Sequence, residues 1–113
     1  MDSDCESYTR EVSFVTEMFR GKWTLQILCA MRNEPVRLSQ LTRLFPGASK
    51  KALRAGLRHL ELAQIIVRRD LSDTLLQVEY DFADEMRQPI GSLLDHLAQW
   101  GELIRGNEQS LSN

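Results

Sequence analysis

The sequence is poor in cysteine and contains no long apolar run. Its 113 residues include two cysteines, which are too few to staple a small secreted fold. No apolar stretch approaches the roughly 20 residues that a membrane-spanning helix needs. The first residues show no basic segment followed by an apolar one, as a signal peptide would. These absences argue against a disulfide scaffold, a membrane helix and a secreted protein, and they predict a cytoplasmic location.

The two cysteines are predicted to have different surroundings. Cys29 lies in the apolar run 27–31 and is expected to be a buried small hydrophobe. Cys5 lies near the N-terminus, a segment that we expect to be mobile, and Arg10 is its nearest basic neighbour. We therefore predict that Cys5 is a surface thiol without a function.

The sequence also lacks the residue combinations of an enzyme or a metal site. His59 and His96 stand far apart in the chain, with no cysteine or carboxylate at ligand spacing. No nucleophile is accompanied by a base and an orienting residue that the sequence would bring together. We therefore expect no enzymatic activity, no cofactor and no metal.

Charge is distributed unevenly along the chain. The formal net charge is −2, from 14 basic and 16 acidic residues, which taken alone argues against a nucleic-acid partner. Binding depends on where the charges lie rather than on their total, and Glu61 is the only acidic residue between positions 50 and 69. The basic residues of this segment are Lys50, Lys51, Arg54, Arg58, Arg68 and Arg69. A basic segment within an acidic chain predicts a local contact with nucleic acid.

Apolar periodicity predicts a single, mostly helical α+β domain. Turns are expected at Pro46-Gly47 and at Ser72–Thr74. Helices are expected at 8–19, 22–33, 39–45, 49–62 and 84–105, and β-strands at 65–71 and 76–80. This order is that of a winged helix-turn-helix, with a core at about residues 20–82, a two-stranded wing, and additional helices at the two ends of the chain.

The helix at 49–62 has the clearest pattern, with Ser49 as a good N-cap. Leu53, Leu57 and Leu60 form an apolar stripe along this helix. Lys50, Arg54 and Arg58 are spaced four residues apart and form a basic ridge on another face. A helix in the DNA major groove buries one face on its own domain and offers the opposite face to DNA. We therefore predict that this helix enters the major groove.

The β-hairpin is the expected wing. Because successive strand residues point to opposite faces, we expect one of Arg68 and Arg69 to reach DNA. The predicted DNA-binding residues are Ser49, Lys50, Lys51, Arg54, Arg58, Arg68 and Arg69.

Several short motifs resemble the HxlR-type family of regulators, a branch close to the MarR type. The resemblance covers about residues 20 to 101, and the Gly-Lys-Trp and Pro-Gly-x-Ser pieces at their separation are specific. The motifs are Gly21-Lys22-Trp23, Ile27-Leu28, Arg37-Leu38-Ser39-Gln40-Leu41, Leu44-Phe45-Pro46-Gly47-Ala48-Ser49, Leu53, Leu57-Arg58-His59-Leu60-Glu61, Val78-Glu79-Tyr80 and Trp100-Gly101.

The resemblance implies a homodimeric winged-helix repressor or activator, with a repressor expected, in which the first and last helices form the dimer interface. That agrees with the apolar faces of these helices, where Ile90, Leu97 and Ile104 keep heptad register. The predicted dimer residues are Val12, Val15, Met18, Ile90, Leu94, Leu97, Trp100 and Ile104. The expected partners are double-stranded DNA, a second copy of the chain, and an unidentified small-molecule or redox effector.

The chain departs from this family in four places. Arg10 stands near the position where many relatives have a cysteine, so the thiol-sensor role is not transferred to Cys5. Gln64 replaces the usual glycine after the recognition helix, so we expect a differently shaped turn. The wing between 71 and 77 lacks proline and is shorter. Ala83 replaces the usual hydroxyl cap of the last helix, which leaves Asp81 or Asp84 as the cap.

Two hypotheses therefore follow from the sequence. The first is a sequence-specific DNA-binding regulator, and the alternative is a winged-helix protein-interaction module that does not bind DNA. Trp23 and Trp100 are expected to be core or interface anchors. His59 is expected either to touch a DNA phosphate or to face solvent.

Overall fold

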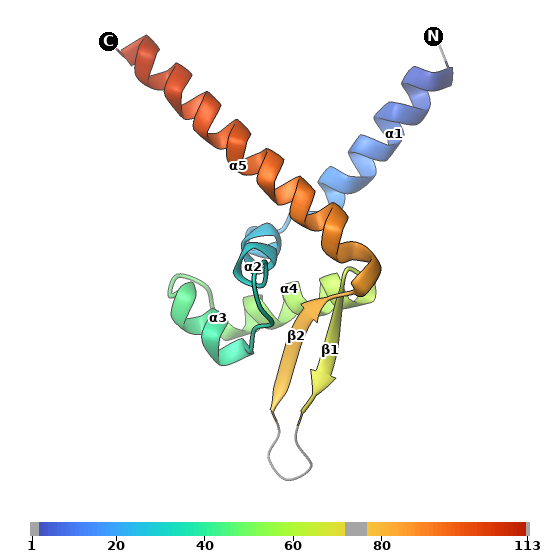
Figure 1. The fold of residues 1–113 in the computed structure, drawn as a ribbon, viewed down its shortest axis with the longest axis vertical. Helices are drawn as coiled ribbons and strands as arrows, with labels where there is room; N and C mark the ends of the chain where they lie inside the picture. Colours follow the sequence, from blue (N-terminus) through green and yellow to red (C-terminus); the bar gives the residue numbers. More distant parts are fainter. Residues whose placement is uncertain (1–2, 72–76, 113) are drawn as a thin grey trace.

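The computed structural model describes residues 3–71 and 77–112. The turn predicted at Ser72–Thr74 and the strand position Leu76 lie outside the described residues. Within these described ranges, five helices and one antiparallel pair of strands follow one another in the predicted order (Figure 1). The elements are α1 (Ser3–Met18), α2 (Thr24–Ala30), α3 (Leu38–Leu44), α4 (Lys50–Leu62), β1 (Ile66–Asp70), β2 (Val78–Phe82) and α5 (Asp84–Ser112). The predicted mostly helical winged helix-turn-helix is confirmed.

The core lies where α2, α3, α4, the sheet and the first turns of α5 meet. Leu53, Leu57 and Leu60 of α4 are buried, as their spacing predicted. Each such leucine contributes about 1.5–3 kcal/mol to folding by leaving water. The full cluster of buried apolar residues is Ile27, Leu28, Met31, Val36, Leu41, Leu53, Leu57, Leu60, Ile65, Ile66, Phe82, Ile90 and Leu94.

A close approach of α2 to α4 depends on a residue without a side chain. A Cβ atom built on Gly56 would lie 2.8 Å from Cδ1 of Ile27, which is closer than carbon atoms pack. Gly56 therefore allows the two helices to come together, at the cost of lower helix propensity within α4.

The wing strands pair in a register that includes Ile66 with Phe82 and Arg68 with Tyr80. On its other side, Tyr80 exchanges two backbone hydrogen bonds with Val36, of 2.9 and 2.8 Å. The segment before α3 therefore forms a single-residue bridge with β2, and this bridge places Arg37 beside the wing.

The turn after α4 keeps a left-handed residue although it lacks glycine. Gln64 has φ of 63°, its N–H donates to Glu61 O at 3.0 Å, and the N–H of Ile65 donates to Leu60 O at 3.0 Å. These two bonds form a Schellman motif. The expected different shape of this turn is wrong, because these two bonds hold Gln64 in the conformation that glycine favours.

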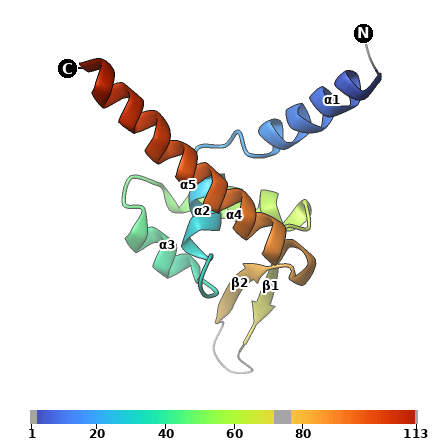
Figure 2. The same cartoon turned by 45° about the horizontal axis from the view of Figure 1, so that its top comes forward.

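The two ends of the chain project from the core as terminal arms, which we define as residues 3–18 of α1 and residues 97–112 of α5 (Figure 1). Figure 2 shows the same arrangement from a second direction. The first turns of α5 belong to the core, where Ile90 and Leu94 are buried. An ion pair between Arg32, just after α2, and Asp95 also attaches α5 to the core.

Helix lengths differ from the prediction at several ends. The first helix begins before Tyr8, α2 is shorter at both ends than 22–33, and α5 continues past Arg105. Pro89 lies within the second turn of α5, where its missing N–H removes one hydrogen bond close to the start of the helix. None of the described helices is long and apolar enough to span a membrane.

Both cysteines are free and exposed. The predicted burial of Cys29 is wrong: in α2 the neighbouring Ile27 and Leu28 face the core, and at about 100° per residue Cys29 is turned away from them. Cys5 is at the surface, as predicted, but it lies in helix α1 rather than in a mobile segment.

Candidate nucleic-acid interface

The start of α4 is fixed by its cap. The Ser49 side chain accepts a hydrogen bond from the N–H of Ala52 at 3.0 Å, and a cap of this kind contributes about 1 kcal/mol to helix stability. Lys50, the first helical residue, is therefore held at the beginning of the helix. The predicted N-cap is confirmed, and the hydroxyl of Ser49 has a structural role.

The basic side chains of α4 are exposed. Lys50, Lys51, Arg54 and Arg58 all face solvent, on the sides of the helix away from its buried leucines. Within the described residues, none of the four has a carboxylate at ion-pair distance. Their positive charge is therefore not neutralised by any carboxylate of the residues that the structure describes.

The two arginines of β1 lie on opposite faces of the wing. Arg68 turns toward α3 and α4, where it lines a cleft with Arg54. Arg69 lies on the other face, with its Nη1 atom 3.8 Å from Oδ2 of Asp81. Strand alternation anticipated this separation, and the structure places Arg68 on the same side as α4.

The cleft between α3, α4 and the wing, which we call the wing cleft, has a volume of about 430 Å³. Three arginines, Arg37, Arg54 and Arg68, meet at its walls, and none of its described lining residues is a carboxylate. The other lining residues are Leu38, Ser39, Gln77, Val78 and Tyr80. Guanidinium groups that gather without an acidic partner provide a strong site for a phosphate.

Arg37 is the residue of this cleft that the sequence analysis missed. Its backbone N–H donates to Oε1 of Gln40 at 2.8 Å, which caps the start of α3. Its Nη2 atom donates to Oε1 of Gln77 at 3.3 Å, which holds the side chain toward the wing. The basic residue directly before a short helix was the available signal, but its neighbours come from distant parts of the chain.

Asp81 connects the wing to α5. Its buried carboxylate accepts hydrogen bonds from Arg87 at 2.9 and 3.3 Å and from the N–H of Phe82 at 2.8 Å. Burial raises the pKa of Asp81, but the hydrogen bonds from Arg87 and Phe82 and the charges of Arg87 and Arg69 outweigh burial. The pKa is therefore below its ordinary value of 3.8.

The expected carboxylate cap of the last helix is not found in the described residues. Asp81 is engaged with Arg87 and Phe82, and Asp84 lies 3.9 Å from Arg87 in an ion pair. Their charges at the start of α5 still favour its positive end.

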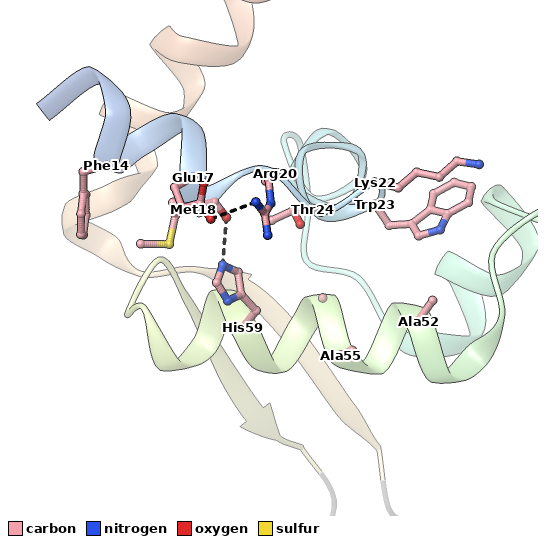
Figure 3. Close-up of a pocket in the computed structure, with 12 residues that line it drawn as sticks. Phe14, Glu17, Met18, Arg20, Lys22, Trp23, Thr24, Ala52, Ala55 and His59 are labelled. Carbon is pink, nitrogen blue, oxygen red and sulfur yellow. Dashed lines mark hydrogen bonds and ion pairs between the residues drawn. The ribbon is translucent and has the colours of Figure 1, made fainter. Parts of the chain in front are cut away.

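A second cleft, of about 670 Å³, lies between α1, α2 and α4 (Figure 3). On α4 it is bordered by small residues: Ala52 and Gly56 line its floor, and the exposed Ala55 lies at its edge. At one end the Nε2 atom of His59 is 2.8 Å from the carbonyl oxygen of Met18, the last residue of α1. The side chain of His59 is exposed, as one of its two expected environments predicted, and it contacts the end of the N-terminal arm. Its contact with a DNA phosphate stays a prediction.

The predicted dimer residues differ in their exposure. Ile90 and Leu94 are 3% and 6% exposed and pack in the protomer's own core, so their side chains do not contribute to a free surface. Met18 is half-buried against the core. The exposed members are Val12, Val15, Leu97, Trp100 and Ile104, all of them on the terminal arms.

The remaining candidate residues of the sequence analysis are the possible metal ligands and Trp23. In the described part of the chain, no three His, Cys, Asp or Glu side chains are grouped as a metal ion would need. Trp23 packs against Phe45 with ring centroids 5.8 Å apart, which agrees with a role as a core anchor.

Comparison with known proteins gives consistent results. A family model described as HxlR-like helix-turn-helix matches residues 18–109. The uncharacterized HTH-type transcriptional regulator YdzF of Bacillus subtilis (strain 168) is 32% identical over 102 residues, which cover 89% of this chain and 93% of that protein. An uncharacterized HTH-type transcriptional regulator of Methanothermobacter thermautotrophicus is 26% identical over 109 residues, which cover 96% of this chain and 82% of that protein. The structure of the redox regulator HypR in its reduced form aligns with a TM-score of 0.80 and 25% identity, covering 88% of this chain and 98% of that one.

Proposed function

The chain belongs to the HxlR-like helix-turn-helix family of transcription regulators, and from that premise we propose that it represses transcription as a homodimer that inserts α4 into the DNA major groove. The observation that supports this proposal most directly is the surface formed by α4 and the wing cleft. It presents exposed cations on a helix whose opposite face is buried, and no carboxylate in the described part of the chain forms an ion pair with them. A major groove is wide enough for one such helix.

Electrostatics supports DNA as the partner despite the acidic total charge. Each phosphate that a lysine or arginine neutralises releases a counterion, and this release drives association. The net charge of −2 is a sum over the whole chain, whereas Arg37, Arg54 and Arg68 meet at the wing cleft, next to the other exposed cations of α4. The attraction to DNA depends on the charge of the surface that contacts it, rather than on the net charge of the chain.

The exposed apolar residues of the terminal arms support a homodimer. Trp100 and Ile104 are 63% and 54% exposed, and apolar groups at helical spacing gain free energy when a second helix covers them. A two-fold dimer would place two α4 helices on successive turns of one DNA face, about 34 Å apart.

The test is DNA binding by the intact chain and by variants of α4. A duplex enriched from fragments of the source genome serves as the probe, and fluorescence anisotropy gives Kd as a function of salt. Arg54→Ala and Arg58→Ala are each expected to weaken binding by about fivefold or more, with unchanged thermal unfolding. Arg105→Ala, which removes the same charge from the C-terminal arm, is the matched control.

The alternative of a protein-interaction module predicts a different result. A folded dimer that has no measurable affinity for any duplex at low salt would support that module and exclude the regulator. Wild-type affinity in both α4 variants would instead show that DNA is bound by another face.

A further inference from the structure

We propose that the surface of α4 is divided between two tasks: Lys51, Ala55 and Arg58 contact base edges, and Arg54 joins Arg37 and Arg68 in holding backbone phosphates. This inference rests on the proposed function, because it specifies which part of a DNA operator each group recognises. It assigns sequence specificity to three residues and makes the wing cleft a phosphate site.

The neighbours of α4 define its sides. The leucine stripe faces the core, Arg54 turns to the wing cleft, and Gly56 and His59 border the cleft next to α1. Successive residues of an α-helix are rotated by about 100° around its axis. Viewed down the axis of α4, Lys51, Ala55 and Arg58 therefore lie within roughly 50° of the direction opposite the leucine stripe. All three residues are exposed, and Ala55 also lines the edge of the cleft next to α1. They therefore form the crest of α4, the part of the helix that faces away from the leucine stripe.

The crest has a length that matches a few base pairs. Lys51 and Arg58 are about two helical turns apart, which is roughly 10.5 Å along the axis. Successive base pairs are about 3.4 Å apart. With α4 lying along the groove, the two cations reach base pairs about three steps apart, and Ala55 faces a base pair between them.

The chemistry of the crest selects the bases. Lysine and arginine carry donors without acceptors, so they pair with O6 and N7 of guanine. The methyl group of Ala55 offers apolar contact to the C5-methyl group of thymine. The crest contains no carboxylate or amide, which are the groups that recognise cytosine and adenine. The expected half-site therefore has two G·C pairs about three steps apart, with a T·A pair between them.

The wing cleft has a different character. Arg37, Arg54 and Arg68 come from three separate elements and converge on one hollow, instead of forming a row along the groove. Arg37 is directed by its hydrogen bond to Gln77. Contacts of this type fix the register of a protein on DNA and carry no sequence information.

The experiment is selection from a randomised duplex library with wild-type protein, Arg58→Ala and Arg37→Ala, followed by Kd measurements against salt. Arg58→Ala is expected to lose the guanine preference at one position of each half-site and to bind the wild-type operator about 5- to 150-fold more weakly. Arg37→Ala is expected to keep the selected sequence, weaken operator and scrambled duplex by the same factor, and lower the salt slope by about 1.

The contact of Ala55 has its own probe. Replacing thymine by deoxyuridine at the central position removes the C5-methyl group, and this should weaken binding of the wild type. The same replacement should have no effect on Ala55→Gly. Circular dichroism melts confirm that each variant is folded before its binding is compared.

The outcomes separate this inference from the proposed function. In one outcome the wild-type protein selects an operator, but Arg58→Ala keeps every guanine preference or Arg37→Ala changes the selected bases. This outcome would overturn the division of α4, and the proposed DNA-binding function would stand. A wild-type protein that enriches no duplex would overturn the proposed function, and the division with it.

Discussion

The core and the terminal arms use the same kind of amphipathic helix, but they differ in what covers the apolar side. In the core, Leu53 and Leu57 of α4 are 0% and 1% exposed because α2, α3 and the sheet enclose them. On the arms, Trp100 and Ile104 have a similar spacing and remain mostly exposed. The comparison teaches that apolar periodicity defines a face, and that a second element decides whether the face is a core or an interface.

The largest effect is expected in the core. Leu57→Ala removes buried methyl groups and leaves a cavity, and it should lower the free energy of unfolding by about 2–5 kcal/mol. Urea unfolding followed by circular dichroism measures this change. A loss of less than about 1 kcal/mol would mean that the site around Leu57 collapses to fill the space.

On the arms, the double variant Trp100→Ala and Ile104→Ala should act on association rather than on the core. We expect the dimer Kd to rise at least about 100-fold, because aromatic and aliphatic anchors dominate helix interfaces. Sedimentation equilibrium gives the dimer Kd. Glu102→Ala, on the opposite side of α5, is the control, and equal dimer Kd values in both variants would place the interface elsewhere.

The contact that attaches the start of α5 to the wing, at the base of the C-terminal arm, should have a smaller effect that is sensitive to acid. Asp81→Asn removes the charge that binds Arg87 near the start of α5, and it should cost about 1–3 kcal/mol at neutral pH. The folded pKa of Asp81 is lowered, so the unfolded chain takes up its proton first as the pH falls. The stabilisation by Asp81 is present above pH 3.8 and is lost as the pH falls below that value.

Urea unfolding of the wild type and of Asp81→Asn at neutral pH and near pH 3 tests this dependence. The difference between the two proteins should shrink in acid. Asp84→Asn, which changes an exposed carboxylate beside the same arginine, should have a smaller effect at both pH values. A difference that is constant with pH would exclude the charge of Asp81 as its cause.

The smallest effect is expected at the turn after α4. Gln64→Gly should raise the free energy of unfolding by about 0.5–1 kcal/mol, because glycine takes φ of 63° without the cost that a side chain adds. The gain is partly offset by the greater freedom of glycine in the unfolded chain. Gln64→Ala keeps the Cβ atom and should show no gain, and a gain in both variants would exclude this explanation.

Local patterns predicted most of the fold. The stripe of α4, its cap at Ser49 and the strand alternation at Arg68 and Arg69 depend on neighbours within a few residues, and the structure agrees with each. The existence of every helix and strand was also predictable, whereas several of their ends were not, because helix ends depend on tertiary contacts.

The rest depends on contacts between distant segments, which periodicity does not contain. Arg37 reaches the wing through the bridge between Val36 and Tyr80. Ile90 belongs to the core because the start of α5 packs on the domain. The same apolar pattern in the same helix thus leads to burial near its start and to exposure toward its end.

The hydrogen bond between His59 and Met18 connects the N-terminal arm directly to α4, the helix that we propose to read DNA. The imidazole stands on α4 and binds the last carbonyl of α1 at 2.8 Å. A rotation of α1 must therefore either break this bond or pull α4 with it. A rearrangement of this arm that keeps the bond would therefore also displace α4.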